Sequence, residues 1–420
     1  MLRFFAIRMA SASHKVAIPK NGVDYRGGVV LAPMVRSGEL PSRLLALKYG
    51  ADLVWGPETI DRSMIGTTRR FNPITSTVDF TRLPSNSGKS SQSQPKESLI
   101  YRIHPVREHG RLIFQLGTAS PQTAVEAARL VAKDVAGIDV NAGCPKPFST
   151  SGGMGAALLQ DPERLAAILT ALVNEVGRTY EIGISVKIRL LDRSDQTKAL
   201  VQRLCQTGIT GLTVHCRTTP MRPRERAIRD QLSMISDICR GYGVACLMNG
   251  DVKNRDEALR LMQDYQVDGA MIATAAESNP SCFRTNQDGG LSPWAEVVRE
   301  YLKLALDVDN RWGNTKFMLA QLVPGKAEAF RRISSSMSYK QICEGLGLFD
   351  ELERAQAVDL RLGLDETRKT KAMKRSATKI QEISGPKIAE RQREPEDRVL
   401  PEWRMLSRMD QPDPGYLIVS

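Results

Sequence analysis

The sequence predicts an α/β fold, a (β/α)8 TIM barrel followed by a smaller all-helical domain. Eight short apolar runs alternate with helical patterns, and only helical patterns follow Pro280. Continuous apolar runs are typical of parallel strands buried on both faces, and eight of them close a barrel. A doubly wound open sheet is the alternative, but no G-x-G-x-x-G motif follows the first strand. The expected strands are Gly28–Leu31, Asp52–Trp55, Leu112–Leu116, Gly137–Val140, Ile184–Ile188, Gly211–His215, Val244–Met248 and Gly269–Ile272.

Helical patterns, with apolar residues three and four positions apart, lie between most of these strands. Ser120, Asp161 and Asn254 stand where an N-cap is expected, and proline follows the first two. The patterns within the barrel cover Pro121–Val135, Asp161–Val176, Asp195–Thr207, Ala227–Arg240 and Asn254–Tyr265. Those of the helical domain cover Trp294–Leu306, Thr315–Leu322, Lys326–Ser334 and Tyr339–Leu346.

Five segments are expected along the chain. Residues 1–24 form a basic, flexible leader, and residues 25–285 form the barrel, with a low-complexity surface insertion of no catalytic importance at about 82–98. Residues 286–366 form the helical domain, and residues 367–420 form a basic tail. The tail reads equally well as a solvated segment and as an electrostatic arm for nucleic acid.

The charge balance favours a polyanionic partner. The 420 residues carry 59 Lys and Arg against 47 Asp and Glu, a formal net charge of +12, so nucleic acid is the leading candidate. No apolar run approaches the roughly 20 residues that span a bilayer, so we expect no membrane partner. We also expect the protein to be a monomer. Seven scattered cysteines without a C-x-x-C pair indicate neither a disulfide framework nor a metal site. A cytoplasmic or nuclear location fits, and the basic leader also allows a mitochondrial one.

The stretch from Gly137 to Lys146 is a short apolar strand that ends in a glycine turn with one amide and one thiol. Cys144 lies between Gly143 and Pro145, where the backbone has little freedom. Strand-end loops carry the chemistry of (β/α)8 barrels, so this thiol is a candidate functional group. A small buried hydrophobic residue is the alternative interpretation.

The carboxyl ends of the other strands are unusually polar as well. Lys187 and Arg189 share one face of the fifth strand, and two cations inside a barrel need an anion or an electron-rich cofactor to meet them. An internal ion pair with Glu58 or Asp139 is the alternative. The loops after strands seven and eight are suited to a phosphate, because barrels often bind one there and small residues admit close backbone contacts. These loops contain Asn249, Gly250 and Asp251, and the run from Ala273 to Ala276.

In these blocks the chain resembles the tRNA-dihydrouridine synthases, and within them the eukaryotic branch that modifies uridine 20. The resemblance lies in residues 31–36, 44–52, 139–146, 149–159, 186–189, 213–215, 279–280 and 314–316. It implies an FMN-dependent barrel in which NADPH reduces the flavin and hydride then passes to C6 of an extruded uracil in tRNA. It also implies that Cys144 is the general acid that protonates C5, a role that requires a protonated thiol.

The resemblance assigns the remaining site residues by position. The flavin ring would contact Pro33, Met34, Val35 and Gln115, with Lys187 near its N1 and O2 edge and His215 near the ribityl chain or phosphate. Asn249, Gly250, Asp251, Ala273 and Thr274 would hold the phosphate end. Asn141 would help to position the uracil, while Lys146, Arg189 and Arg217 would contact the nucleotide or its backbone.

The sequence departs from the family pattern at the phosphate site. Thr274 stands where an arginine is usual, which leaves backbone N–H groups and His215 to bind the phosphate. The tail is also too short and too poor in apolar residues for the double-stranded RNA-binding domain of some animal members. Two alternatives stay open: a flavin barrel that acts on a small molecule, and a non-catalytic RNA-binding homologue.

Overall fold

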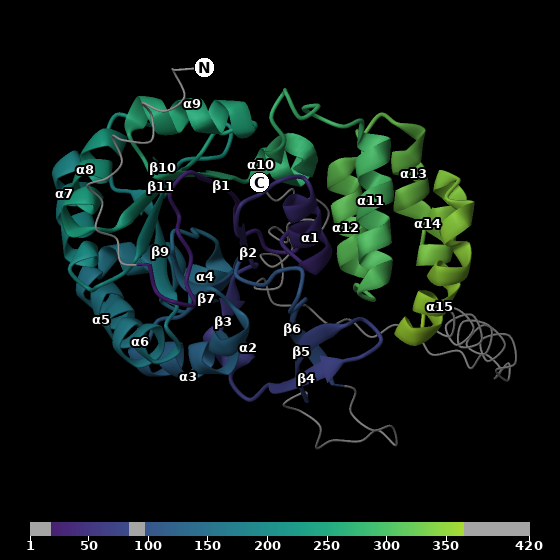
Figure 1. Cartoon of the computed structure of the whole chain (residues 1–420), viewed down its shortest axis with the longest axis horizontal. Coiled ribbons are helices and arrows are strands. Elements are labelled where there is room, and N and C mark those ends of the chain that lie inside the picture. The colour runs from purple at the N-terminus through teal and green to yellow at the C-terminus, as the bar shows by residue number, and fades with distance from the viewer. Residues whose placement is uncertain (1–17, 84–96, 365–420) are drawn as a thin grey trace, which may run out of the picture. The chain divides into compact units, whose positions relative to one another are not determined.

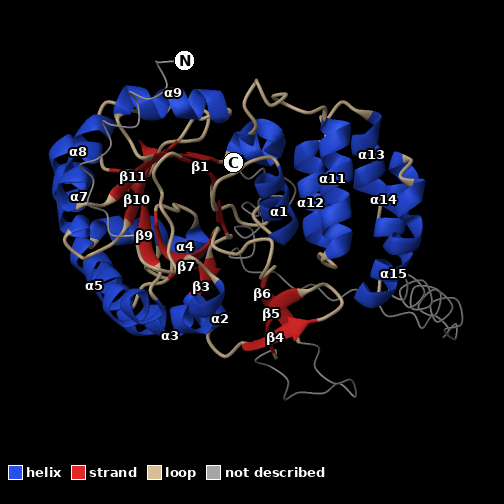
Figure 2. Cartoon of the chain, in the orientation of Figure 1, coloured by secondary structure: helices blue, strands red, loops and turns tan. Residues whose placement is uncertain are grey.

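Eight parallel strands close into a barrel, which confirms the predicted fold class. The computed structural model describes residues 18–83 and 97–364, and those up to Leu362 belong to one compact unit. The strand order is β2-β1-β12-β11-β10-β9-β8-β7, and β2 pairs with β7 to close the ring of strands (Figures 1 and 2). The bounds are β1 Gly28–Leu31, β2 Val54–Trp55, β7 Leu112–Gly117, β8 Gly137–Ala142, β9 Gly183–Leu190, β10 Gly211–Thr218, β11 Ala245–Asn249 and β12 Gly269–Ile272.

The second barrel strand is broken, which its sequence did not indicate. After β2 the chain leaves the barrel wall and returns as β3 (Thr59–Ile60), which pairs with β7 again. Four positions separate Trp55 from Thr59, but only three separate their partners Ile113 and Leu116 on β7. The extra residue is a bulge, a device that re-aims side chains beside active sites.

Helices cover the outside of the barrel (Figure 2). The Asp161 side chain accepts from the Arg164 N–H and that of Asn254 from the Glu257 N–H, as their N-cap positions predict, whereas Ser120 makes no capping bond. The helices of the barrel region are α1 Leu40–Lys48, α2 Asp61–Met64, α3 Pro121–Val131, α4 Pro147–Thr150, α5 Pro162–Leu172, α6 Arg178–Tyr180, α7 Ser194–Cys205, α8 Leu232–Tyr242, α9 Arg255–Tyr265 and α10 Thr274–Ser278, of which α4 lies at the mouth.

Helix α8 begins five residues later than the sequence pattern predicts. The Ala227 N–H donates to the Asp251 carboxylate (2.7 Å) and the Ile228 N–H to the Cys216 carbonyl (2.7 Å). These bonds tie the segment before α8 to the ends of β10 and β11, so its backbone groups are not available for a helix.

An apolar cluster that includes Tyr25, Trp55, Leu247 and Met271 packs in the core of the barrel. Tyr25 is 1% exposed, and the chain before it is also attached, because the Asn21 N–H donates to the Glu181 carbonyl (2.8 Å). The expected flexible leader therefore does not extend to residue 24; residues 1–17 lie outside the described part of the chain.

The segment after the barrel is helical, as expected, with one additional helix, α15. Within this helical segment, the buried Tyr339 hydroxyl donates to the Asn310 carbonyl (2.7 Å) and lies 2.6 Å from the Thr315 hydroxyl. Within the described residues, no helix has the length and apolar character to cross a membrane. The bounds are α11 Trp294–Asp307, α12 Trp312–Leu322, α13 Glu328–Ser335, α14 Tyr339–Leu346 and α15 Leu352–Leu362.

The connection between β3 and β7 carries an antiparallel sheet that the sequence analysis missed. Its strands are β4 (Thr68–Asn72), β5 (Thr77–Arg82) and β6 (Ser98–Ile103), in the order β4-β5-β6. Most of the expected low-complexity insertion, residues 84–96, lies outside the described part of the chain. The segments on either side of it thus pair with each other as β5 and β6.

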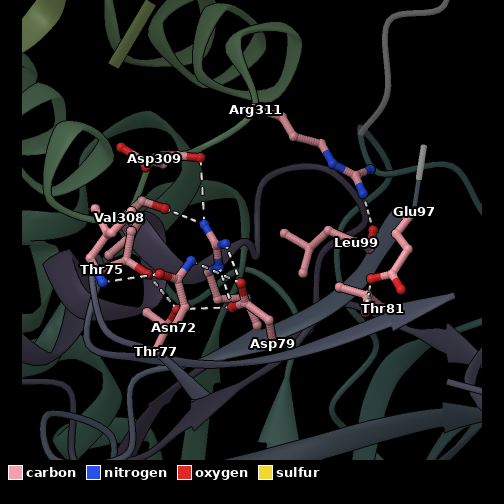
Figure 3. A network of polar contacts seen from close by, with 12 residues as sticks. Asn72, Thr75, Thr77, Asp79, Thr81, Glu97, Leu99, Val308, Asp309 and Arg311 are labelled. Carbon is pink, nitrogen blue, oxygen red and sulfur yellow. Dashed lines mark hydrogen bonds and ion pairs between the residues drawn. The ribbon is translucent and has the colours of Figure 1, made fainter. Parts of the chain in front are cut away.

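A half-buried arginine ties this sheet to the loop between α11 and α12. Arg102 on β6 makes two bonds to the Asp79 carboxylate on β5, at 2.6 and 2.5 Å, and also donates to the Val308 carbonyl. Arg311 in the same interhelical loop donates to the Leu99 carbonyl on β6 (Figure 3). The sheet therefore joins the barrel insertion to the C-terminal helices.

Replacing Arg102 with methionine should destabilise the protein by about 2–4 kcal/mol, because Asp79 would keep a buried charge without its partner. Urea unfolding followed by circular dichroism measures the change. Arg129→Met is the matched control: its pair with Glu175 is half exposed, and its loss should cost about 0.5 kcal/mol or less. Equal effects of the two substitutions would contradict this role of Arg102.

Candidate active site

The alternation of side chains along the parallel strands brings the predicted polar residues together inside the barrel. Gln115 on β7 lies opposite Asp139 on β8, and Asp139 lies opposite Ser185 on β9. One layer nearer the carboxyl ends, Asn141 lies opposite Lys187. Residues two apart in a strand point to the same face, so these side chains form stacked polar layers at the barrel mouth. The next layer contains Arg189, His215 and Asn249.

The loop that carries Cys144 is held from three sides. The Asn141 side-chain oxygen accepts from the backbone N–H groups of Gly143 (3.0 Å) and Cys144 (3.1 Å). Arg189 Nε donates to the Gly143 carbonyl (2.8 Å), and the Ala156 N–H donates to the Cys144 carbonyl (2.9 Å). These bonds fix the thiol at the end of β8.

A glycine is required where the chain returns behind this loop. Gly155 has φ +56°, and a Cβ atom there would lie 2.5 Å from the Cys144 carbonyl oxygen. Any other residue would push the Cys144 loop away or strain the backbone. The glycine-rich run after α4 is therefore part of the support for the thiol.

The surroundings of Cys144 keep its thiol protonated. Burial raises its pKa, and the negative charge of Glu58 adds to this effect, while Lys146 and Arg189 oppose it. A protonated thiol is poorly suited to act as a nucleophile but can donate a proton. This electrostatic setting favours an acid role for Cys144.

Lys187 places an ammonium group in the buried part of the mouth. Burial lowers its pKa to about 8, with a further contribution from the charge of Arg189, and Asp139 opposes the shift. Asp139 is itself bound by Gln115 Nε2 (2.8 Å) and Ser185 Oγ (2.7 Å). Among the described residues, Lys187 Nζ makes no hydrogen bond and no ion pair with Asp139 or Glu58, so its donors are available to a ligand.

His215 is held neutral beside this lysine. Burial lowers its pKa, and the charges of Lys187, Arg189 and Arg217 lower it further. Arg217 lies 3.2 Å from His215 Nε2 and can only donate, so we infer that Nε2 accepts and that Nδ1 carries the proton. His215 can therefore offer one N–H to a ligand.

The Arg217 guanidinium is committed to the protein itself. Besides His215, it donates to the carbonyls of Glu225 (2.7 Å) and Pro223 (2.9 Å) and pairs with the Asp251 carboxylate (2.5 Å). Its side chain is 6% exposed. These partners make Arg217 a support for the loop after β11, and its predicted contact with a nucleotide stays a prediction.

The loops after β11 and β12 lie next to this support. Asn249 Nδ2 donates to the Met271 carbonyl (3.0 Å), and a Cβ atom on Gly250 would lie 3.4 Å from the His215 ring. The Asp251 carboxylate faces Arg217 and the Ala227 N–H, so only backbone groups of this residue suit an anion. Thr274 is exposed at the start of α10.

Arg229, which the sequence analysis did not single out, lies beside the loop after β11. It donates from Nη2 to the carbonyls of Gly250 (2.9 Å) and Asp251 (3.0 Å), and its Nε is buried with no hydrogen-bond partner among the described residues. It lies within an arginine-rich stretch from Arg222 to Arg229, in which no local pattern distinguishes one arginine from the next.

The other predicted residues line the rim of the mouth. Pro33 and Met34 follow β1 and are half buried, and Val35 is exposed. Lys146 precedes α4, and its charge acts on both Cys144 and Glu277. Glu277 in turn bonds to Ser37 after β1.

The chain matches a family model and curated relatives over most of its length. The model "Dihydrouridine synthase (Dus)" matches residues 30–344. The "tRNA-dihydrouridine(20) synthase [NAD(P)+]" of Schizosaccharomyces pombe is 48% identical over 80% of this chain and 66% of its own length. The Saccharomyces cerevisiae protein of the same name is 46% identical over 76% of this chain and 83% of its own.

A more distant group of relatives also carries the family name. The "tRNA-dihydrouridine(20a/20b) synthase [NAD(P)+]-like" protein of Homo sapiens is 27% identical over 64% of this chain and 76% of its own length. The family match and the two fungal relatives agree with the barrel and its polar mouth: the chain belongs to the dihydrouridine synthase family.

Proposed function

We propose that this protein is a tRNA-dihydrouridine synthase that uses NADPH and FMN to reduce the C5–C6 double bond of uridine 20. The observation that carries the proposal is the placement of Cys144, Asn141, Lys187 and His215 in one barrel mouth, in a chain of the dihydrouridine synthase family. The names of the fungal relatives support the substrate and the nicotinamide reductant. The net charge of +12 suits a tRNA partner.

The donor set of the mouth fits FMN. The ammonium of Lys187 suits the polar edge of a flavin ring, where negative charge gathers on reduction. Gln115 lies on β7 one layer deeper, beside Asp139, and Met34 follows β1 and packs against the barrel core. His215, the backbone of Gly250 and the open Arg229 Nε suit a phosphate. When bound, the flavin supplies the hydride for C6 of the base.

Cys144 would supply the proton for C5. Asn141 and Arg189 hold its loop, so the thiol keeps a fixed position while a base enters. Its raised pKa keeps the proton on sulfur until carbon accepts it. A uridine in a folded tRNA would have to leave its stack to reach this depth.

Replacing Cys144 with alanine should leave bound FMN and NADPH oxidation intact and lower dihydrouridine formation by at least about 100-fold, because only the proton donor is lost. Flavin absorbance, NADPH consumption and primer extension on tRNA measure the three properties. Cys343→Ala removes a buried thiol of the helical segment and is the control. A Cys144→Ala enzyme that forms dihydrouridine at the wild-type rate would contradict the assignment.

Replacing Arg229 with methionine should weaken FMN binding by about tenfold, because a donor beside the proposed phosphate site is lost. Titration of the apoprotein with FMN, followed by quenching of flavin fluorescence, gives the dissociation constant. Arg226→Met removes an exposed arginine three residues away and should leave this constant unchanged. Equal constants for the wild type and Arg229→Met would show that Arg229 does not contact the phosphate.

A further inference from the structure

Glu58 lies in the break of the second barrel strand, at the level of Asn141. The bulge between β2 and β3 turns its side chain toward Gly117, where a Cβ atom would lie 2.5 Å from Glu58 Oε1. Gly117 is two positions after Gln115 on β7, so its missing side chain would point into the barrel. The carboxylate of Glu58 therefore occupies the place of an inward side chain at the mouth.

Among the described residues, only Oε1 of Glu58 accepts a hydrogen bond; the Asn141 amide lies near the carboxylate but outside hydrogen-bonding geometry. Oε1 accepts from the hydroxyl of Ser149 (3.1 Å), which is fully buried on α4 behind the Cys144 loop. Oε2 is buried and accepts no hydrogen bond from any described residue. A buried oxygen without a donor is unfavourable, so a ligand that brings a donor is stabilised there.

The charge of Glu58 also affects the Cys144 loop. Burial raises its pKa, while Ser149 and the Asn141 amide favour the charged form. Its charge acts on the Cys144 thiol, which also faces Lys146 and Arg189. The carboxylate and the proposed proton donor thus share one environment.

Three polar side chains close to Glu58 in the mouth, those of Asn141, Lys187 and Arg189, can only donate to a base. The Asn141 oxygen is already used by two backbone N–H groups, so its amide has donors alone to offer. Lys187 and Arg189 have no acceptors. The Watson–Crick edge of uracil needs donors for O2 and O4 and one acceptor for N3–H.

We propose that Glu58 Oε2 accepts the N3–H of the target uracil and thereby selects uracil against cytosine. Cytosine presents a lone pair at N3 in place of the N–H, so it would face the carboxylate with a repulsive contact. This inference rests on the proposed function, because it names the atom that recognises its substrate. Glu58 is then a specificity residue, while Cys144 remains the proton donor.

The test compares tRNA transcripts with uridine or cytidine at the target position, bound to the FMN-loaded enzyme. The wild type should bind the uridine transcript about 10- to 100-fold more tightly, the range for a hydrogen bond to a charged group. In Glu58→Gln the preference should fall to about threefold or less, because an amide can turn either its oxygen or its nitrogen toward N3. An unchanged preference in Glu58→Gln, or none in the wild type, would overturn the inference.

The matched control is Glu277→Gln. Glu277 is a half-buried acid at the same rim, bonded to Ser37, and its neutralisation removes the same charge. It should keep the wild-type preference. If both variants lose the preference equally, the effect belongs to the charge of the rim, and the assignment to Glu58 is wrong.

A second measurement needs no variant and keeps the inference falsifiable if Glu58→Gln does not fold. A transcript with 3-methyluridine at the target position lacks the N3–H, and the wild type should lose at least tenfold in kcat/KM on it. Equal kcat/KM for the two transcripts would overturn the inference. The two proposals fail differently: no dihydrouridine on the unmodified transcript refutes the enzyme function, whereas normal formation with an unmoved preference refutes only the role of Glu58.

Discussion

The burial of two cations on one strand constrains the whole barrel mouth. Lys187 and Arg189 are two positions apart on β9, so both side chains point into the barrel. A buried charge there destabilises the protein unless it has a partner. Arg189 meets this requirement with the carbonyls of Gly143 and Thr218, and in doing so it holds the Cys144 loop. The nearby charge of Asp139 is the largest effect that stabilises the charged form of Lys187, and no described residue accepts a hydrogen bond from its ammonium group.

Whether a polar side chain already has hydrogen-bond partners within the protein separates the residues that support the mouth from those that can bind a ligand. Arg217 and the Asp251 carboxylate satisfy each other, so they stiffen the loop after β11. Within the described part of the chain, Arg229 Nε and Glu58 Oε2 are buried without a hydrogen-bond partner. A buried group without a partner is unfavourable in the free protein, and it is where a ligand gains most from binding.

The attachment of the C-terminal helices depends on an element outside the barrel. The sheet β4-β5-β6 brings Arg102 between Asp79 and the loop after α11, and a second bond joins Arg311 to β6. Asn314 on α12 also donates to Glu39 before α1 (2.6 Å). Bonds between residues more than 200 positions apart thus fix the helical segment to the sheet of the barrel insertion and to the segment before α1.

The sequence by itself determined the barrel, the helices that follow it and the strand-end position of Cys144, because buried parallel strands and amphipathic helices leave periodic apolar patterns. It did not determine the bulge at Glu58, the sheet β4-β5-β6 or the partners of Arg217 and Arg229. Bulges, edge sheets and hydrogen-bond partners depend on which residues meet across strands, and no local pattern records that. Only the tertiary structure decided which polar groups at the mouth are satisfied and which remain open.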